Sequence, residues 1–272
     1  MTFADLALAK RLESAEGYAC TQFAVARSRI HPQFGSCWTE CGGALLTFDG
    51  VEAPTTQSFG LGLFTELTES VLEEAEAFFF MRGTSAMHEV CPLAGPAALK
   101  LLCDRGYRPI EISNVLYLSI SEPAEGIARS AAGVRVRVIG KDEAALWTDV
   151  CARGWTHEHP ELEDFMRQTG ALLVSREGSP CFLAEVDGQP GAAGAMVIHE
   201  GVALLAGAAT VPELRRRGLQ SALLEARLRY ASEDGCDLAM MVTETGSKSQ
   251  RNAERLGFRV AYTRTKWQSE SK

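Results

Sequence analysis

Residues 210–224 decide the fold, and they read TVPELRRRGLQSALL. The apolar run 202–211 predicts a buried strand, and from residue 219 the apolar positions recur at the spacing of an amphipathic helix. Between them lies a turn with three consecutive arginines and Gly218. The unpaired N–H groups and the positive dipole end of a first helical turn attract anions, and glycine lets a ligand approach the backbone. The stretch therefore predicts a phosphate or pyrophosphate site.

A basic run before a helix also has a simpler interpretation, a solvated helix cap. The stretch is neither of two common phosphate motifs. No Lys-Ser or Lys-Thr pair follows Gly218, and there is no Gly-x-Gly-x-x-Gly. The sequence that follows favours the ligand site over the cap.

The downstream sequence completes a longer order of elements. Residues 238–243 are strand-like, a helical stretch ends at Gly257-Phe258, and residues 259–267 are again strand-like. Gly257 is typical of a residue that ends a helix in the left-handed conformation. The order strand, basic turn, helix, strand, helix, Gly-Phe, strand resembles the GCN5-related N-acetyltransferase (GNAT) superfamily. The resemblance is strong over residues 203–267 and extends more weakly back to residue 134.

In that family the first motif reads Arg/Gln-x-x-Gly-x-Gly/Ala. Arg215 and Gly218 match it, whereas Gln220 replaces the small residue. The resemblance implies acetyl-CoA as cosubstrate, with the pantetheine arm along the backbone of 209–211 and the pyrophosphate on the amides of 216–221. It also implies that an asparagine holds the pantetheine end. The implied cofactor-binding residues are Ala209, Thr210, Val211, Arg216, Arg217, Gly218, Leu219, Gln220, Ser221 and Asn252.

The implied reaction moves an acetyl group from acetyl-CoA to a primary amine. The thioester oxygen needs a hydrogen-bond donor as charge develops, and the backbone N–H of Val211 is the expected one. The amine must lose a proton, so a base is needed. Glu244, which follows the strand-like residues 238–243, is the expected base, and Glu185 is the second candidate. Each carboxylate can also be an ordinary strand-end or hairpin residue.

The leaving thiolate has no evident proton donor. The tyrosine that is usual in the family would stand at Ala253. Tyr262, Ser249 or water are the replacements, and a CoA thiol is a reasonable leaving group near neutral pH. The missing tyrosine keeps an alternative function open, a CoA-binding sensor or regulatory protein without turnover.

The first half of the chain repeats the order of elements. Its strand, helix, strand, helix and strand are predicted at 58–64, 71–79, 87–90, 96–104 and 110–120. Residues 65–70 take the place of the basic turn, and they carry two carboxylates and no glycine. Our hypothesis is a degenerate GNAT-like domain that does not bind CoA. The alternative is an unrelated α/β domain that shares the order by chance.

The predicted organisation is a degenerate domain at 1–121, a linker at 122–133 and an acetyl-CoA-binding domain at 134–272. The predicted fold class is α+β. Each domain is expected to be a mixed, mainly antiparallel sheet flanked by helices, with a splayed strand pair for CoA in the second. The opening segment predicts a long helix that His31-Pro32 ends.

Further elements are predicted before the cofactor strand. They are strand 134–139, helices 142–155 and 161–173, and hairpin strands 181–186 and 194–199. In the resemblance the two helices wall the acceptor site.

Composition limits the other functions. A net charge of −8 argues against nucleic-acid binding, including an aminoacyl-tRNA donor. No apolar stretch reaches the ~18 residues of a membrane span, and no signal peptide is recognisable, so a cytoplasmic protein without membrane partners is expected. The eight cysteines are scattered without Cys-x-x-Cys spacing, which predicts reduced thiols and no zinc. We interpret His157-Glu158-His159 as a surface loop, not a metal site.

The expected acceptor is a small-molecule or peptide amine. Residues 1–122 carry eight basic and fifteen acidic side chains, which favours a cationic amine. An acidic surface also serves solubility alone. The chain is expected to be a monomer or a homodimer.

Overall fold

The computed structural model describes residues 3–120, 133–157 and 160–270 of the 272. They form two compact units. The first combines Met1–Leu118 with Met240–Lys272, and the second is Ser119–Ala239. The predicted linker lies almost entirely outside the described residues.

The first unit is a mixed sheet with helices. Its elements are α1 (Leu6–Ile30), β1 (Cys37–Cys41), β2 (Ala44–Phe48), β3 (Gln57–Phe59), α2 (Glu69–Phe80), β4 (Met87–Val90), α3 (Gly95–Asp104), β5 (Arg108–Ser119), α7 (Lys248–Arg255) and β11 (Arg259–Gln268). Strands β1, β2 and β3 pair antiparallel, and β3 pairs parallel with β4. Strand β11 pairs antiparallel with both β4 and β5. Strand β10 (Leu238–Glu244) passes from the second unit into the first.

Local chemistry sets both ends of α1. The side chain of Asp5 accepts a hydrogen bond from the N–H of Leu8 at 2.9 Å, which caps the first turn. Pro32 disfavours a helical conformation at His31, where the helix ends. The helix buries Leu8, Leu12, Ala15, Ala19, Phe23 and Ala26. Ile30, its last residue, is 46% exposed.

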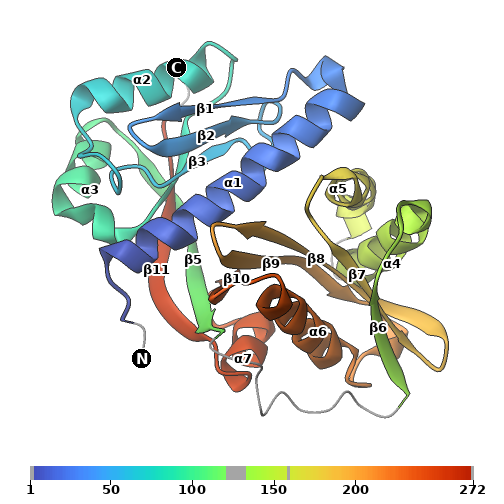
Figure 1. Ribbon diagram of the computed structural model, residues 1–272. Coiled ribbons are helices and arrows are strands. Elements are labelled where there is room, and N and C mark those ends of the chain that lie inside the picture. The colour runs from blue at the N-terminus through green and yellow to red at the C-terminus, as the bar shows by residue number, and fades with distance from the viewer. Residues whose placement is uncertain (1–2, 121–132, 158–159, 271–272) are drawn as a thin grey trace. The chain divides into compact units, whose positions relative to one another are not determined.

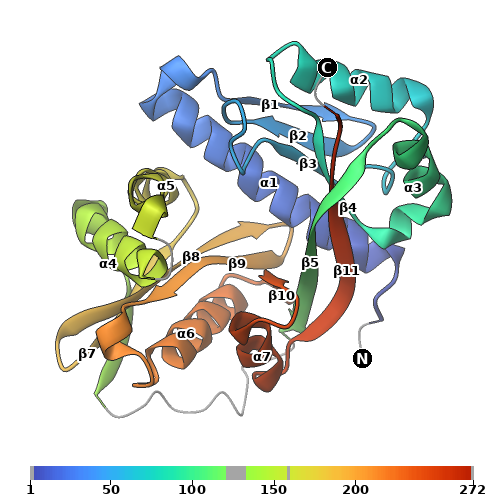
Figure 2. The ribbon, with the colours of Figure 1, turned by 180° about the vertical axis from the view of Figure 1, so that it is seen from behind.

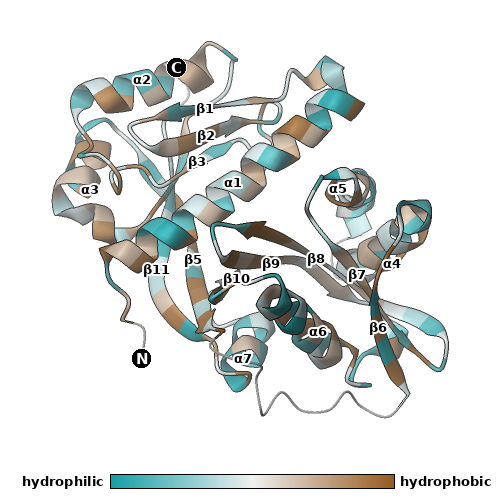
Figure 3. Cartoon of the chain, viewed as in Figure 1, coloured by the Kyte–Doolittle hydropathy of each residue, from teal (hydrophilic) through white to brown (hydrophobic). Residues whose placement is uncertain are grey.

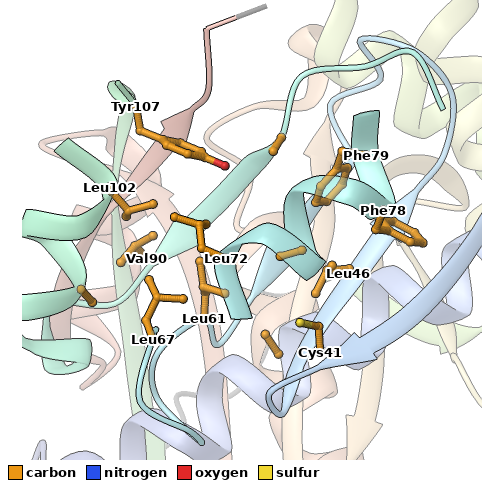
Figure 4. Close-up of a cluster of buried hydrophobic side chains, with 14 of the residues drawn as sticks. Cys41, Leu46, Leu61, Leu67, Leu72, Phe78, Phe79, Val90, Leu102 and Tyr107 are labelled. Atoms are coloured by element: carbon orange, nitrogen blue, oxygen red, sulfur yellow. The ribbon is translucent and has the colours of Figure 1, made fainter. Parts of the chain in front are cut away.

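An apolar core joins α2 and α3 to the sheet of the first unit. Figure 4 shows Leu72 and Phe79 of α2, Leu46 of β2, Val90 of β4 and Leu102 of α3 gathered in it. All five side chains are at most 2% exposed. Burial of each such side chain contributes about 1.5–3 kcal/mol. This core fixes the two helices on the sheet.

Strand β11 is held in the first unit by pairing and by buried charge. Figure 1 shows it, in red, beside the green β5. Arg264 at its centre is 2% exposed, and its guanidinium lies 2.7–3.1 Å from carboxylate oxygens of Glu13, Glu16 and Glu89. Residues 259–268 therefore pack with the first half of the chain, whereas the sequence assigned all of 134–272 to one domain. Pairing between segments so distant in sequence leaves no local signal.

The second unit is an antiparallel meander with helices on both faces. Its elements are β6 (Val134–Val138), α4 (Ala144–Thr156), α5 (Glu163–Ser175), β7 (Cys181–Val186), β8 (Gln189–His199), β9 (Val202–Thr210) and α6 (Leu219–Glu233). Neighbouring strands pair in the order β6, β7, β8, β9. Helices α4 and α5 lie on one face and α6 on the other (Figures 1 and 2). Figure 3 shows β8 and β9 in brown, because helices cover their apolar residues on both faces.

The predicted α+β class with mainly antiparallel sheets flanked by helices is confirmed. The predicted hairpin strand 194–199 is longer in the structure, since β8 begins at Gln189. None of the helices in the described part of the chain is both long and apolar enough to cross a membrane.

Candidate functional site

Strand β9 contains a bulge near its end. The pairs with β8 pass from Ala195↔Ala206 to Ala193↔Ala209, so β9 has one more residue than β8 between them. Gly207, in this gap, has a φ of +60°. A glycine in the left-handed conformation is the usual first residue of such a bulge, which bends the strand and leaves a residue unpaired. The bulge therefore redirects the backbone just before the predicted cofactor residues Ala209 and Thr210.

Helix α4 approaches the end of β9 closely at a glycine. A Cβ added to Gly154 would stand 2.6 Å from Cβ of Ala209 and 3.0 Å from the nitrogen of Thr210. The guanidinium of Arg215 joins the same two segments. Its Nη2 donates to the carbonyl of Gly154 at 3.3 Å, and its Nε donates to the carbonyl of Thr210 at 3.4 Å. Arg215, matched to the first family motif, is half-buried and links the loop after β9 to α4.

The loop before α6 has the backbone of an anion site. Arg216 has a φ of +65° and Gly218 a φ of +81°, so left-handed residues stand on both sides of Arg217. A side chain other than glycine rarely adopts this conformation, and such strain often marks a functional site. Gly218 is the N-cap of α6 and supplies no side-chain hydrogen bond to the first turn. The amides of Leu219, Gln220 and Ser221 therefore remain available to an anion.

The two arginines in this loop differ in their surroundings. Both are exposed. Nη2 of Arg217 lies 2.5 Å from a carboxylate oxygen of Asp187, in the turn between β7 and β8. Arg216 takes part in no ion pair among the described residues. Its charge is therefore the less neutralised of the two.

Val211 is not available for the role predicted for it. Its backbone N–H donates to the carbonyl of Gly191 at 2.9 Å. An amide already paired within the protein is a poor donor to a thioester oxygen. This corrects the sequence interpretation. The hydrogen bond exists because β8 and β9 remain adjacent beyond their last ladder pair, Ala192↔Thr210.

Several predicted residues belong to the first unit. Glu244 is the last residue of β10 and is exposed. Asn252 and Ser249 are exposed on α7, whose first turn is capped by the hydroxyl of Ser247 accepting the N–H of Gln250 at 3.2 Å. Ala253, at the position of the family's tyrosine, is 1% exposed. A small side chain packed in the core leaves no polar group there.

Two alternative acid–base candidates are engaged elsewhere. Glu185 lies in an ion pair with Arg137, 3.0 Å from its Nη2. Tyr262 is 7% exposed, and its hydroxyl donates to Glu13 at 2.8 Å. Burial raises the pKa of Tyr262 well above its usual value of 10. These contacts indicate structural roles for both side chains.

The first unit has no equivalent anion loop among its described residues. In the repeat that the sequence predicts, α2 takes the place of α6. Its first turn is capped by the hydroxyl of Thr68, which accepts the N–H of Val71 at 3.3 Å, and it carries Glu69. Phe64 lies against Gly60, where an added Cβ would come within 2.7 Å of the ring. A capped and negatively charged helix start attracts anions less than the start of α6.

Within the described ranges, no group of three His, Cys, Asp or Glu side chains could hold a metal ion. Glu158 and His159 lie outside those ranges.

The sequence analysis did not predict the bulge in β9. An isolated glycine within a strand pattern, here Gly207, is the usual signal of one.

Part of the chain matches a known protein family. Residues 143–258 match the model of the acetyltransferase (GNAT) family. This segment contains β9, α6 and the loop of residues 211–218 between them, the arginine loop. A search of curated proteins found no match to the chain.

Solved structures show the same fold at low sequence identity. A GCN5-related N-acetyltransferase from Kribbella flavida has a TM-score of 0.65 and 19% identity over 97% of this chain and 96% of its own. A conserved protein of unknown function from Staphylococcus epidermidis has a TM-score of 0.61 and 10% identity over 90% of this chain and 98% of its own. A tandem GNAT protein from the clavulanic acid biosynthesis pathway has a TM-score of 0.54 and 17% identity, over 84% and 74%. The family match and the fold together support acyl transfer from an acyl-CoA.

Proposed function

We propose that this protein transfers an acetyl group from acetyl-CoA to a primary amine of a small molecule or peptide. The observation that carries the proposal is the loop of Arg216, Arg217 and Gly218 before the uncapped first turn of α6. A diphosphate needs several amide donors and positive charge in one place, and this loop offers both. The loop lies within the segment that matches the acetyltransferase family.

We assign the catalytic roles to groups that are not engaged in other contacts. The amide of Val211 is occupied, so we assign the oxyanion donor to the bulge at Gly207, which the pairing with β8 passes over. We retain Glu244 as the general base because it is an exposed carboxylate at a strand end. Glu185 is the weaker candidate, since a base held by Arg137 is less ready to accept a proton. We assign the thiolate proton to water. We also propose that the protein is cytoplasmic and that it is a monomer or a homodimer.

Titration calorimetry with acetyl-CoA tests the site. We expect one site per chain in the wild type and an affinity about 10- to 100-fold lower in the Arg216→Ala/Arg217→Ala variant, because hydrogen bonds to charged groups contribute about 1.5–3 kcal/mol each and exposure reduces that. Arg229→Ala removes an exposed charge from the same helix and is the control. Absence of binding in the wild type would overturn the proposal.

The stoichiometry also tests the first half. We propose that it is a degenerate GNAT-like domain without a CoA site, which rests on the Thr68 cap, Glu69 and the packing of Phe64. Two acetyl-CoA molecules per chain would contradict this.

A second function has a specific observation in its favour. Ala253 is buried and Tyr262 is engaged with Glu13, so no tyrosine is assigned to protonate the thiolate. This is compatible with a CoA-binding sensor or regulatory protein. Release of free CoA thiol from acetyl-CoA with a panel of primary amines separates the two functions. Tight binding without turnover on any amine would favour the sensor.

A further inference from the structure

Arg227 of α6 is a buried cation without an acidic partner. It is 1% exposed, and none of the ion pairs of the described residues includes it. Burial lowers the pKa of Arg227 to about 10, so the guanidinium stays charged at neutral pH. A buried unpaired charge is costly to a fold and calls for an explanation.

The guanidinium contacts backbone carbonyls at the bulge. Nη1 donates to the carbonyl of Ala195 at 3.2 Å and to that of Ala206 at 3.4 Å, and Nε donates to the carbonyl of Leu223 at 3.4 Å. Two of these carbonyls belong to the last ladder pair before the bulge, Ala195↔Ala206. The positive charge of Arg227 therefore lies next to the backbone at which the bulge of β9 begins.

One peptide group connects Arg227 to the bulge. The carbonyl of Ala206 and the N–H of Gly207 belong to the same planar peptide, and the described chain contains no cis bond. In a trans peptide the two groups point in opposite directions, so the Gly207 N–H points away from the guanidinium. The pairing of β9 with β8 passes over Gly207. On the next peptide, the Gly207 carbonyl accepts from the thiol of Cys151 on α4 at 3.8 Å.

Positive charge at a peptide carbonyl strengthens the N–H of the same peptide as a donor. The carbonyl draws electrons from the amide nitrogen, and linked hydrogen bonds reinforce one another. The effect is larger in a low-dielectric interior. We propose that Arg227 is a positioning residue that polarises the Ala206–Gly207 peptide, so that the Gly207 N–H stabilises the thioester oxygen of bound acyl-CoA. This inference rests on the proposed function.

The step in which this donor acts is the addition to the thioester. The amine nitrogen forms a bond to the thioester carbon, and the π electron pair of the carbonyl moves onto oxygen, which the Gly207 N–H holds. The carbonyl then re-forms, the C–S bond breaks and its electrons leave with sulfur. The proton lost by the amine passes through base and water, and the CoA thiolate takes up a proton from water. A stronger donor lowers the barrier to addition and leaves pyrophosphate binding unchanged.

The competing interpretation is structural, in which Arg227 only satisfies carbonyls that α6 and the bulge would leave unpaired. Arg227→Gln separates the two, because a neutral amide can still donate to a carbonyl but lacks the charge. Arg227→Lys keeps the charge. Arg229→Gln, an exposed position on the same helix, is the control.

Isotope-edited infrared spectroscopy of acetyl-CoA carrying ¹³C at the acetyl carbonyl gives a direct readout, since no amine need be present. In the wild type we expect the carbonyl band of the bound thioester at lower wavenumber than that of the free thioester. Arg227→Gln should lose most of this displacement while its CoA affinity changes little. Arg227→Lys should restore much of it. With an amine acceptor, Arg227→Gln should lower kcat about 10-fold with KM for acetyl-CoA retained.

The outcomes are distinct. A wild type that binds no acetyl-CoA would overturn the proposed function and this inference with it. A bound band that is not displaced, or one equally displaced in Arg227→Gln, would overturn the inference alone. If Arg227→Gln fails to bind CoA, Gly194→Ala is the second test, because its Cβ would stand 3.0 Å from Cδ2 of Leu223 and 3.3 Å from Cζ and Nη1 of Arg227 and press on both side chains. An unaltered band in that variant would also overturn the inference.

Discussion

Thr210, the last residue of β9, donates its hydroxyl hydrogen bond to the side-chain oxygen of Gln220 in the first turn of α6 at 3.2 Å. The bond joins the two ends of the arginine loop. It also gives Gln220 a role at the position where the family motif has a small residue. The side chain that departs from the motif therefore braces the loop.

The hydrogen bond between Thr210 and Gln220 predicts weaker binding when either side chain is removed. Gln220→Ala should weaken acetyl-CoA binding about 2- to 10-fold, since a typical hydrogen bond contributes about 0.5–1.5 kcal/mol. Thr210→Val should have a similar effect, and the double variant should be little worse than either single variant. Calorimetric titration of the four proteins measures this. Fully additive losses would contradict the shared bond.

The ion pair between Arg217 and Asp187 predicts an increase in affinity. Asp187→Asn removes a negative charge beside the loop and tolerates the φ of +54° at this position, because asparagine adopts the left-handed conformation readily. The affinity for acetyl-CoA should rise about 2- to 5-fold at low salt, in keeping with the modest energy of exposed ion pairs. The gain should shrink as salt rises. A lower affinity would mean that Asp187 orients Arg217 productively.

The close approach of α4 predicts that Gly154 tolerates no side chain. Alanine favours a helix by about 1 kcal/mol over glycine. Here its Cβ would stand 2.6 Å from Ala209, and overpacking costs about 1–3 kcal/mol. Gly154→Ala should therefore displace the end of β9 and weaken acetyl-CoA binding about 10-fold. Leu146→Ala, at a 39% exposed position of α4, is the control. Unchanged binding in Gly154→Ala would show that α4 can move without disturbing β9.

The sequence predicted the elements whose signals are local. Helix α6 follows from apolar periodicity and from Gly218 at its start, and β4 coincides with the predicted strand 87–90. The arginine loop was predicted as an anion site because its residue types stand together in the chain. Its left-handed Arg216 could not be read from the sequence, since arginine carries no preference for that conformation.

Features that depend on distant segments could not be predicted. Strand β11 lies beside β4 partly because Arg264 contacts α1. The residues near Arg264 in the sequence do not indicate that Glu13 is its partner. The occupied amide of Val211 depends on where β8 lies, and the unpaired charge of Arg227 depends on which carbonyls it meets. Each is a consequence of tertiary packing that overrides local pattern.

His88 predicts a pH dependence of stability. It is fully buried, with Nδ1 2.7 Å from the hydroxyl of Ser58 and Nε2 3.2 Å from that of Tyr107. Burial lowers its pKa from 6.5 to about 3, so the folded protein holds the ring neutral while the unfolded chain protonates it near pH 6.5. The stability due to neutral His88 is therefore complete above pH 6.5 and is lost as pH falls toward 3.

The slope is at most about 1.4 kcal/mol per pH unit for one proton. Urea unfolding of wild type and His88→Gln between pH 7 and pH 4 should show a flatter dependence in the variant. His157→Gln removes an exposed histidine and is the control. Parallel curves for wild type and His88→Gln would contradict the neutral buried ring.

The buried contacts of Arg264 predict a large loss of stability on its substitution. Its guanidinium faces Glu13, Glu16 and Glu89, and burial raises the pKa of Glu13 and of Glu89 despite that positive charge. Arg264→Met would leave these carboxylates without their main cation and should cost about 3–5 kcal/mol in the free energy of unfolding. Adding Glu13→Gln should recover part of the loss, because it removes one of the uncompensated charges. Arg259→Met, an exposed position on the same strand, is the control. A loss below about 1 kcal/mol, the usual worth of a surface pair, would show that β11 is held by strand pairing and not by this cluster.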